Sequence, residues 1–425
     1  MNEGLIKNFD ELAIDENRKL ILQVVEAGLV AINTRNVVLN SISLQDSLLG
    51  IQNQTFNLNE FKNIKIIGIG KASGEATLAL EEILNSKITE GVIIGLDQIS
   101  CKYIETFVGT HPRPSEANLE AGKKIYELLS NSKESDLIIV IVSGGGSALL
   151  NYPETEYIQG VKLYDAFLKT GKTINEINTI RKHISLLKGG GLAKIAYPAT
   201  VVGLIFSDIP GNNFENVASG PTYKDISTIT DAQKIITENN LGDFELIETP
   251  KEDKYFEKVH NFVLVSNEIA IKAMAEKVQK LGLSTDIVST ELFDNTTEVL
   301  KKIFSTRNKN SNNSVVLAAG EPRIEVKDKN GKGGRNLHLG LQALENIDSN
   351  SIFISIASDG IDNSDVAGAI IDKHTLEKTK ELDLDINDYL NRFDSYSFFN
   401  KIGNTIMTGR TGSNVSDLMI LLTKK

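Results

Sequence analysis

The sequence has few of the residues that disulfide-bonded proteins and cysteine-ligated metal sites require. Its single cysteine, Cys101, excludes an intrachain disulfide and any metal cluster held by several cysteines. We interpret Cys101 as a buried, unreactive thiol.

The sequence also has fewer basic than acidic side chains. Lys and Arg together number 45 against 56 Asp and Glu, which gives a formal net charge of -11. A molecule with this charge repels polyanions, so we expect no nucleic-acid partner. A small anion can still bind, because a few cations and backbone N–H groups in one place outweigh the distant average.

Long apolar runs are absent as well. No stretch of the sequence approaches the length of a membrane span. The first residues, MNEGLIKNFDELAIDENRKL, are acidic and interrupted by polar side chains every few positions, unlike a signal peptide. We therefore expect a cytoplasmic protein without a membrane partner.

What the sequence does contain is typical of a two-domain α/β protein. The 425 residues are too many for one compact core, and 41% apolar with 24% charged residues is an ordinary globular composition. Short apolar, β-rich runs alternate with helical patterns, which predicts a parallel sheet with helices on both faces. The predicted strands of the first half are residues 64–70, 91–96, 137–142 and 200–206.

A polar, acidic and turn-rich segment, residues 238–254, predicts the domain junction. A second alternation follows, and its predicted strands are residues 261–266, 284–289, 315–319 and 352–357. The predicted domains are therefore a parallel-sheet domain over residues 1–250 and a smaller C-terminal α/β domain over residues 255–425. In this prediction the last segment of the chain is able to pack back on the first domain.

The unusual motifs of the first half lie where predicted strands end, which is where parallel sheets bind ligands. In GIGKASG, Lys71 stands between strand and helix and is well placed to neutralise a phosphate. The spacing fits neither common nucleotide motif, since Gly74 lies four positions after Gly70 and Ala72 follows the lysine. The alternative is a solvated lysine on a tight turn.

The segment SGGGSA directly follows a run of β-branched and leucine residues. Its open glycine backbone can wrap an oxyanion, and a plain flexible loop does not account for the serine on either side. We expect this segment to bind substrate or nucleotide through Ser143, Gly144, Gly145, Gly146 and Ser147.

A histidine and two aspartates complete the strand-end motifs. THPRP places His111 beside a proline of fixed φ, although a lone histidine is more often structural than functional. Asp208 in SDIPG and Asp359 in SDG each follow a buried strand. Carboxylates at such positions suit Mg²⁺ or a base for a hydroxyl, and the alternative is that each caps the next helix.

A glycine-rich turn in the second half, GKGGRN, ends on Arg335 and enters an apolar helical pattern. Its N–H groups and the helix start predict a bound anion, with contributions from Gly333, Gly334 and Asn336. Judged alone, a plain surface turn is the simpler interpretation. Together with the other motifs, this arrangement of lysine, arginine, glycine loops and carboxylates describes phosphoryl transfer rather than covalent catalysis.

Taken in order, the motifs resemble one family. Between about residues 64 and 422 the chain contains GIGKASG, GTHPRPSEAN, SGGGSALL, INTIRKHISLLKGGGLAKIAYPA, SDIPGNNFENVASGPT, GGRN, SDGIDNSDVAGAIID and TGRTGSNVSDL. This series resembles the glycerate 2-kinases of the two-domain MOFRL type. The resemblance implies ATP- and Mg²⁺-dependent phosphorylation of D-glycerate at its 2-hydroxyl, giving 2-phosphoglycerate. It also implies a larger N-terminal Rossmann-like domain and an active site in the cleft between the domains.

The resemblance assigns roles to individual residues. The family's catalytic lysine and arginine fall on Lys71 and Arg335, and we expect these two, one from each domain, to flank the transferring phosphoryl group. Asp208 then acts on the acceptor hydroxyl or holds Mg²⁺ through water, and Asp359 is the second candidate for the metal. A phosphate or the substrate carboxylate is expected at the glycines after Ser143 and at a second glycine loop, with the contributing residues Arg181, Lys188, Gly189 and Gly190.

The chain departs from the family in several loops. Asn212 and Asn213 stand where the family has aspartates, and Arg410 stands where it has a proline. Leu337 and His338 replace a polar and an acidic residue after GRN. Any difference from an ordinary glycerate kinase is expected at this last pair.

Two other functions stay open. A hydroxypyruvate or tartronate-semialdehyde reductase would use the same three-carbon acids, but it needs a dinucleotide site that the glycine spacing does not favour. A non-catalytic sensor of a phosphorylated sugar acid would keep the anion pocket and alter the loops. In each case we expect a monomer or homodimer whose ligands are small molecules.

Overall fold

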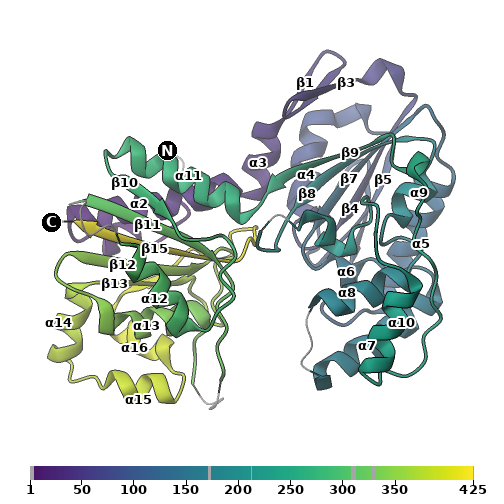
Figure 1. The fold of residues 1–425 in the computed structure, drawn as a ribbon. Coiled ribbons are helices and arrows are strands. Elements are labelled where there is room, and N and C mark those ends of the chain that lie inside the picture. The colour runs from purple at the N-terminus through teal and green to yellow at the C-terminus, as the bar shows by residue number, and fades with distance from the viewer. Residues whose placement is uncertain (1–3, 171–173, 212, 308–312, 327–330, 425) are drawn as a thin grey trace. The chain divides into compact units, whose positions relative to one another are not determined.

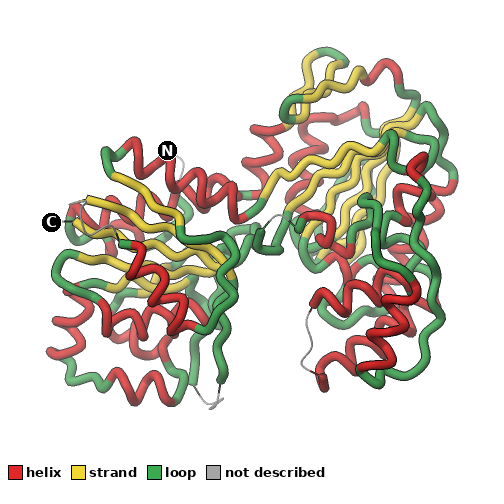
Figure 2. The backbone as a smooth tube through the Cα atoms, viewed as in Figure 1, coloured by secondary structure: helices red, strands yellow, loops and turns green. Residues whose placement is uncertain are grey.

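The computed structural model describes residues 4–170, 174–211, 213–307, 313–326 and 331–424 (Figure 1). The chain divides into two compact units. One, Thr34–Val265, holds a fully parallel sheet and is called the parallel-sheet unit. The other, Met1–Asn33 with Ser266–Lys425, holds a sheet of mixed direction and is called the mixed-sheet unit. Figure 2 shows that each combines strands with helices.

The parallel-sheet unit is built on six strands in the order β6-β5-β4-β7-β8-β9, and every neighbouring pair is parallel. The central strand β7 is buried along its whole length, because its apolar run is covered on both faces. The predicted parallel sheet is thus confirmed. Its strands are β4 (Asn63–Ile69), β5 (Glu90–Gly95), β6 (Glu105–Val108), β7 (Asp136–Ser143), β8 (Thr200–Phe206) and β9 (Val259–Val265).

Helices cover both faces of this sheet. On one face, Ile67 and Ile69 of β4 share a core with residues of α5 and α9. Gly68 between them points the other way, toward α4, since a Cβ there would lie 3.2 Å from the Thr77 hydroxyl. The helices of this unit are α3 (Thr34–Ser41), α4 (Ser73–Leu84), α5 (Glu116–Ser130), α6 (Gly146–Leu149), α7 (Glu154–Thr170), α8 (Ile174–His183), α9 (Gly191–Ala196) and α10 (Ile229–Glu238). A small antiparallel sheet is also present, formed by β1 (Ile42–Gln45), β2 (Leu48–Ile51) and β3 (Gln54–Asn57).

The mixed-sheet unit has six strands in the order β10-β11-β15-β12-β13-β14. β10 and β11 pair in parallel, and the other neighbouring pairs are antiparallel. The last strand of the chain, β15, lies in the middle of the order, so the last segment is a central part of this sheet. The strands are β10 (Ser284–Ile287), β11 (Asn313–Gly320), β12 (Ser351–Ala357), β13 (Gly368–Ile371), β14 (Thr405–Ile406) and β15 (Asp417–Lys424).

Apolar helix faces complete the second unit. Leu337 and Leu341 of α13 share a core with Phe353 of β12 and Leu421 of β15. Among the described residues no single helix is long and apolar enough to cross a membrane, and α2 and α3 meet that measure only when counted together. The helices of this unit are α1 (Phe9–Leu12), α2 (Glu16–Ile32), α11 (Asn267–Lys280), α12 (Thr296–Thr306), α13 (Arg335–Ala343), α14 (Lys373–Glu381), α15 (Ile386–Asn391) and α16 (Ser395–Ile402).

The N-terminal helix α2 belongs to the mixed-sheet unit. It packs closely on α11 at Gly28, where a Cβ would lie 2.7 Å from the Met274 side chain. Arg18 of the same helix forms a buried ion pair with Asp372, with 2.7 Å between Nε and Oδ2. A buried arginine needs such a partner, so this pair fixes α2 to its unit.

The observed division of the chain differs from the predicted domains of residues 1–250 and 255–425. Residues 1–33 join the later part of the chain, and β9 completes the sheet of the earlier part. The physical reason is that a helix with one apolar stripe can cover either sheet, and that a strand does not encode which sheet it will extend.

Candidate functional site

The carboxyl ends of two neighbouring strands bring a glycine turn and an aspartate together. β7 and β8 pair in register up to Ser143 opposite Phe206, and Gly144 and Asp208 follow. A Cβ on Gly144 would lie 1.9 Å from Oδ2 of Asp208, so the carboxylate rests directly on the glycine backbone. Glycine is required here because any side chain would displace the aspartate.

Lys71 reaches the same turn from the end of β4, which lies beside β7. Its N–H donates to the carbonyl of Gly144 at 2.9 Å. Its side chain crosses Gly145, where a Cβ would meet Cε of Lys71 at 3.1 Å and Cδ2 of His111 at 3.2 Å. The strand ends therefore bring Lys71, His111 and Asp208 to one glycine turn.

The turn also has free N–H groups. Within the described residues, the N–H groups of Gly145, Gly146 and Ser147 donate to no acceptor, whereas that of Ala148 bonds to the Gly145 carbonyl at 3.1 Å. Gly145 has a φ of 79°, a left-handed conformation that glycine adopts without strain. Consecutive free N–H groups beside a lysine form a concave site for an anion.

Two cations make the surroundings of His111 positive. Partial burial, together with the charges of Lys71 and Arg181, lowers the pKa of His111 to about 4, although the residue as a whole is exposed. The ring is therefore neutral at pH 7 and serves as a hydrogen-bond donor or acceptor. Burial also lowers the pKa of Arg181 to about 10, with Glu156 opposing that shift, so the guanidinium keeps its charge.

The two serines that flank the glycines have structural partners. The buried hydroxyl of Ser143 donates to the carbonyl of Ile69 at 3.1 Å and accepts the N–H of Ala72 at 3.1 Å. It therefore joins the ends of β4 and β7. Its contacts favour a bracing role over the expected ligand contact.

A chain of polar contacts leads from the turn to α8. The hydroxyl oxygens of Ser147 and Ser219 lie 2.8 Å apart, and Ser219 donates to Oδ1 of Asn178 at 3.3 Å. The same amide oxygen accepts from Arg181 at 3.3 Å. Arg181 is thereby linked to the glycine turn and stays a candidate for ligand binding.

The second glycine loop differs from the expectation. The N–H of Gly189 donates to the Ser219 carbonyl at 2.9 Å, and that of Gly190 donates to the Gly220 carbonyl at 2.8 Å. Because both groups are already bonded, neither is available to an anion. The glycines serve a tight backbone turn with φ values of 55° and 85°.

Lys188 likewise has an internal partner. Its ammonium group forms a buried ion pair with Glu156, and both side chains are almost completely inaccessible to solvent. Burial lowers the pKa of Lys188 and raises that of Glu156, and their mutual attraction opposes both shifts. The predicted ligand contact of Lys188 is therefore not favoured by its position.

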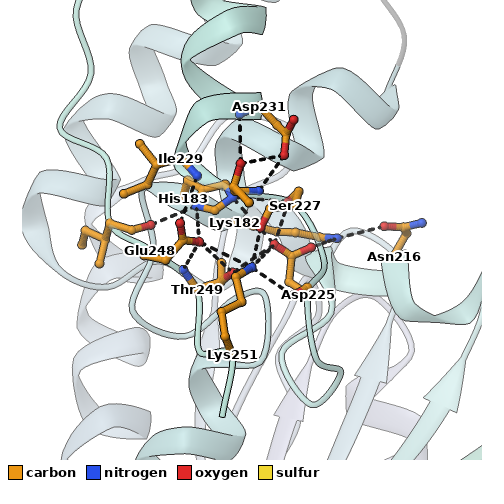
Figure 3. Close-up of polar contacts among 12 residues, drawn as sticks. Lys182, His183, Asn216, Asp225, Ser227, Ile229, Asp231, Glu248, Thr249 and Lys251 are labelled. Carbon is orange, nitrogen blue, oxygen red and sulfur yellow. Dashed lines mark hydrogen bonds and ion pairs between the residues drawn. The ribbon is translucent and has the colours of Figure 1, made fainter. Parts of the chain in front are cut away.

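A buried polar cluster fixes the end of α8 (Figure 3). Asp225 accepts hydrogen bonds from three side chains, those of Lys182 at 3.1 Å, Ser227 at 2.7 Å and Thr249 at 3.1 Å. One ring nitrogen of the fully buried His183 lies 3.0 Å from the Ile247 carbonyl. Arg181 directly precedes Lys182 and His183 on α8. The cluster therefore also fixes the backbone position of Arg181.

The mixed-sheet unit contains a cavity of about 500 Å³. Predicted site residues line it, together with acidic and apolar side chains that the sequence had not singled out. The lining residues are Glu321, Ile324, Val326, Gly331, Gly333, Gly334, Arg335, His338, Ala357, Ser358, Asp359, Ile361, Asp362, Asn363, Phe393, Ser395, Asn414, Ser416 and Asp417.

The start of α13 is already capped by a carboxyl group of the protein itself. The carboxylate of Asp362 accepts the N–H of Asn336 at 3.1 Å and that of Leu337 at 2.8 Å. A Cβ on Gly334 would lie 2.3 Å from Oδ1 of Asp362. The expected external anion at this helix start is therefore replaced by a buried aspartate, and Gly333 and Gly334 shape the backbone around it.

Arg335 lies at the cavity between two acidic side chains. Its Nε is 3.0 Å from Oδ2 of Asp417, and one terminal nitrogen is 3.4 Å from Glu321. About a third of the side chain stays exposed, 35% of its surface. Burial lowers the pKa of Arg335, but Asp417 and Glu321 outweigh this effect and raise it.

Asp417 is a strongly perturbed acid of the cavity. Burial raises its pKa to about 7, although the Arg335 charge and a hydrogen bond from Asn336 oppose the shift. The Asn336 amide donates to Asp417 at 2.9 Å and accepts from the Ser355 hydroxyl at 2.6 Å. Asn336 is buried and fully engaged, so its contacts favour holding Asp417 over binding a ligand.

The sequence reasoning missed Glu321, Asp362 and Asp417. Each is an acid at the end or start of a buried strand or in the loop after one, as in the segments AAGEP, SDGID and SDL. An acid that follows a buried strand is the signal that singled out Asp208 and Asp359. It also fits Glu321 and Asp362, whereas Asp417 begins β15 and carries no such signal. Asp359 lines the same cavity, and its carboxylate accepts the N–H of Ile361 at 3.0 Å.

Comparison with known proteins is consistent with this arrangement. A domain of unknown function (DUF4147) matches residues 20–252, and the MOFRL family matches residues 314–417. The Glycerate 2-kinase of Pyrococcus horikoshii is 33% identical over 434 residues, which cover 95% of this chain and 97% of that protein. The D-glycerate 2-kinase of Thermotoga maritima is 34% identical over 380 residues, 84% of this chain and 89% of that protein.

A solved structure extends the similarity to three dimensions. The crystal structure of the Thermotoga maritima glycerate kinase aligns with a TM-score of 0.83 at 29% identity, covering 95% of this chain and 99% of that one. Both the sequence matches and the structural match run over nearly the whole length. The chain therefore belongs to the two-domain glycerate 2-kinases of the MOFRL type.

Proposed function

We propose that this chain transfers the γ-phosphoryl group of ATP to the 2-hydroxyl of D-glycerate, giving 2-phosphoglycerate. Phosphorylation of glycerate is the activity of the family to which it belongs. The observation that carries the proposal is the glycine turn after β7, where a lysine, free N–H groups and a carboxylate converge. Phosphoryl transfer needs this combination of charge neutralisation, positioning and a group that orients the acceptor.

We assign separate tasks to the groups at this turn. Lys71 neutralises the transferring phosphoryl group, and the N–H groups of Gly145 and Gly146 hold an anionic oxygen of a substrate. Asp208 orients the acceptor hydroxyl and takes its proton. Arg181 adds positive charge near His111, whose neutral ring is left to hydrogen-bond with substrate.

Arg335 of the mixed-sheet unit is the second proposed catalytic cation. Asp417 contacts Nε and one terminal nitrogen of its guanidinium, and Glu321 contacts the other terminal nitrogen. The exposed part of the side chain keeps donors for phosphate oxygens. Arginine suits this task because its planar group binds two oxygens at once.

Mg²⁺ is the proposed cofactor. Among the described residues, no three or more His, Cys, Asp or Glu side chains gather to hold a metal by themselves. This fits Mg²⁺, which proteins often hold through one or two carboxylates together with phosphate oxygens. Asp359 is the residue we assign to it, and Asp208 is the alternative if it does not act on the acceptor hydroxyl. When bound, the ion would neutralise charge on the phosphates of ATP.

An ADP-release screen tests the function. The purified protein is mixed with Mg-ATP and a panel of small hydroxy acids, and the phosphorylated position of the product is identified by NMR. We expect D-glycerate to give the fastest release and the 2-phosphate as product. Release with another acid alone, or a 3-phosphate product, contradicts the proposal.

Two variants test the assigned cations. Lys71→Ala and Arg335→Ala are expected to lower kcat by at least about 100-fold, because each removes charge stabilisation of the transition state. Lys87→Ala, an exposed lysine in the same unit as Lys71, is the control and should keep normal kcat. Near-normal turnover in a folded Lys71 or Arg335 variant would sink that residue's assignment.

A reductase is the second function considered, and the geometry disfavours it. A dinucleotide site needs free N–H groups at the start of the helix after the first strand. Here the N–H of Lys71 bonds to Gly144, that of Ala72 to Ser143, and that of Ser73 to the Gly70 carbonyl at 3.2 Å. A fall in NADPH absorbance at 340 nm on addition of hydroxypyruvate, without ATP, would support the reductase function instead.

We further propose that the enzyme acts in the cytoplasm, where ATP is supplied, as a monomer or homodimer. The excess of acidic residues supports small molecules rather than nucleic acid or a membrane surface as partners. Light scattering on the purified protein measures the oligomeric state, and a mass above that of a dimer contradicts this part of the proposal.

A further inference from the structure

The cavity of the mixed-sheet unit contains buried polar groups without a protein partner. His338 is 6% exposed and Ser395 is 1% exposed, and both line the cavity. Within the described residues, Nδ1 of His338 and the hydroxyl of Ser395 make no hydrogen bond. A buried polar atom without a hydrogen-bond partner is destabilising, so two of them at one cavity favour a ligand that supplies the missing partners.

The histidine presents a flat, neutral surface. Its ring is stacked on Phe393, with the ring centroids 4.9 Å apart and the planes inclined by 10°. Burial lowers the pKa of His338 to about 4, so at pH 7 one ring nitrogen donates and the other accepts. The lining of the cavity also includes the apolar side chains of Ile324, Val326 and Ile361. Apolar walls with a few polar groups are typical of sites for heterocyclic ligands.

The charge of the lining argues against an occupant that is anionic throughout. Of the described residues that line the cavity, Arg335 is the only cation, and Asp362, Asp417, Glu321 and Asp359 oppose it. Even with Asp362 and Asp417 both protonated, the other two acids outnumber the arginine. Glycerate and the phosphates of ATP are anionic, which leaves the nucleoside as the uncharged part of the proposed substrates.

We propose that this cavity binds the base and ribose of ATP, with His338 and Ser395 hydrogen-bonded to the base. The inference rests on the proposed function, because that function supplies ATP as the ligand. Arg335 lies one helical turn before His338 on α13, so both side chains face the same cavity. The nucleoside then occupies the neutral, aromatic part, and the phosphate chain begins at the arginine.

Binding measurements without turnover test this assignment. Calorimetry with adenosine and with the non-hydrolysable analogue AMP-PNP is carried out on the full-length protein in the absence of glycerate. His338→Phe keeps a flat ring against Phe393 but removes both nitrogens. We expect the Kd for both ligands to rise about tenfold in His338→Phe and in Ser395→Ala, the effect of one lost hydrogen bond.

Two further variants test whether adenosine binds in this cavity and not in the parallel-sheet unit. His338→Gln retains a donor and an acceptor, so its Kd for adenosine should rise less than that of His338→Phe. Lys71→Ala alters the glycine turn of the parallel-sheet unit and should leave the Kd for adenosine unchanged, because adenosine carries no phosphate for Lys71 to bind. Equal melting temperatures establish that the compared proteins are folded.

Several outcomes overturn the inference. Unchanged adenosine and AMP-PNP binding in the folded His338 and Ser395 variants would do so, as would the absence of binding in the wild type. A raised KM for D-glycerate with normal nucleotide binding assigns the cavity to the acid instead. The two proposals fail separately: nucleotide binding that depends on His338 without ADP release refutes only the kinase function, and glycerate phosphorylation with unaltered variants refutes only this inference.

Discussion

Adding one methyl group at Gly144 is expected to disable the glycine turn while the fold stays intact. The new Cβ would lie 1.9 Å from Oδ2 of Asp208, and ordinary contact begins at 3.4 Å. The carboxylate must therefore move by about 1.5 Å, the difference between these two distances. Asp208 is half-buried and follows the end of β8, so it can move without disturbing the sheet.

The size of the effect follows from the displacement. A reacting group misplaced by about 1 Å can cost on the order of 100-fold in rate. We therefore expect Gly144→Ala to lower kcat by about 100-fold, which corresponds to about 2.7 kcal/mol in the barrier. Initial rates of ADP release with D-glycerate and Mg-ATP measure kcat, and thermal melting checks the fold.

A control and a double variant isolate the cause. Gly74→Ala introduces a Cβ whose nearest contact is Ile99 at 3.4 Å, so it should keep normal activity. In an Asp208→Ala background the clash is gone, and Gly144→Ala should then add little further loss. Full kcat in Gly144→Ala, or an equal loss of kcat with and without the Asp208 carboxylate, would contradict a steric clash as the cause.

Other predictions concern buried and half-buried ionisable groups. Burial raises the pKa of Asp417 from 3.8 to about 7 in the folded protein. Folding therefore favours the protonated carboxyl group. The stability gained in this way is fully present below about pH 4 and is lost as the pH rises through 7. Asp417→Asn should flatten the fall in melting temperature over that range, and an unchanged pH profile would contradict the assignment. Lys188→Ala leaves Glu156 buried and unpaired and should lower the unfolding free energy by about 3–5 kcal/mol in urea titrations. Combining Lys188→Met with Glu156→Leu should recover most of that loss, and a double variant as unstable as Lys188→Ala would argue against the pairing. Cys101 is half-buried, whereas the sequence led us to expect a buried thiol. Burial is the main cause that raises the pKa of its thiol to about 11, and the Glu81 charge is the lesser cause. Its alkylation by iodoacetamide at pH 8 should be about 100-fold slower than that of an ordinary thiol, by mass spectrometry, because the thiolate is the reacting form.

The parallel sheet and its glycine turn could be predicted because both depend on local sequence. Continuous apolar runs specify β4, β7 and β8, and parallel strands present their carboxyl ends at one edge. Any motif that directly follows such a strand therefore reaches that edge. This is why Lys71, Gly145 and Asp208 meet although they are far apart in the sequence.

The mixed-sheet site could not be predicted in the same way, because its contacts join distant segments. Asp362 caps α13 from a position 26 residues away, and Asp417 reaches Asn336 across 81 residues. A helix start favours an anion whether that anion is a ligand or an aspartate of the chain. The sequence could predict the charge that belongs at the start of α13, but not its source.

The central place of β15 has a consequence for biosynthesis. The ribosome completes the parallel-sheet unit, residues 34–265, long before it reaches Asp417. Helix α2 emerges before that unit, yet the sheet of its own unit lacks the central strand β15 until residues 417–424 leave the exit tunnel. We predict that nascent chains stalled near residue 400 resist protease only over residues 34–265, and protection of α2 at that stage would contradict this order of folding. The cavity that holds Arg335 is therefore complete only after Asp417 and the rest of β15 have been made.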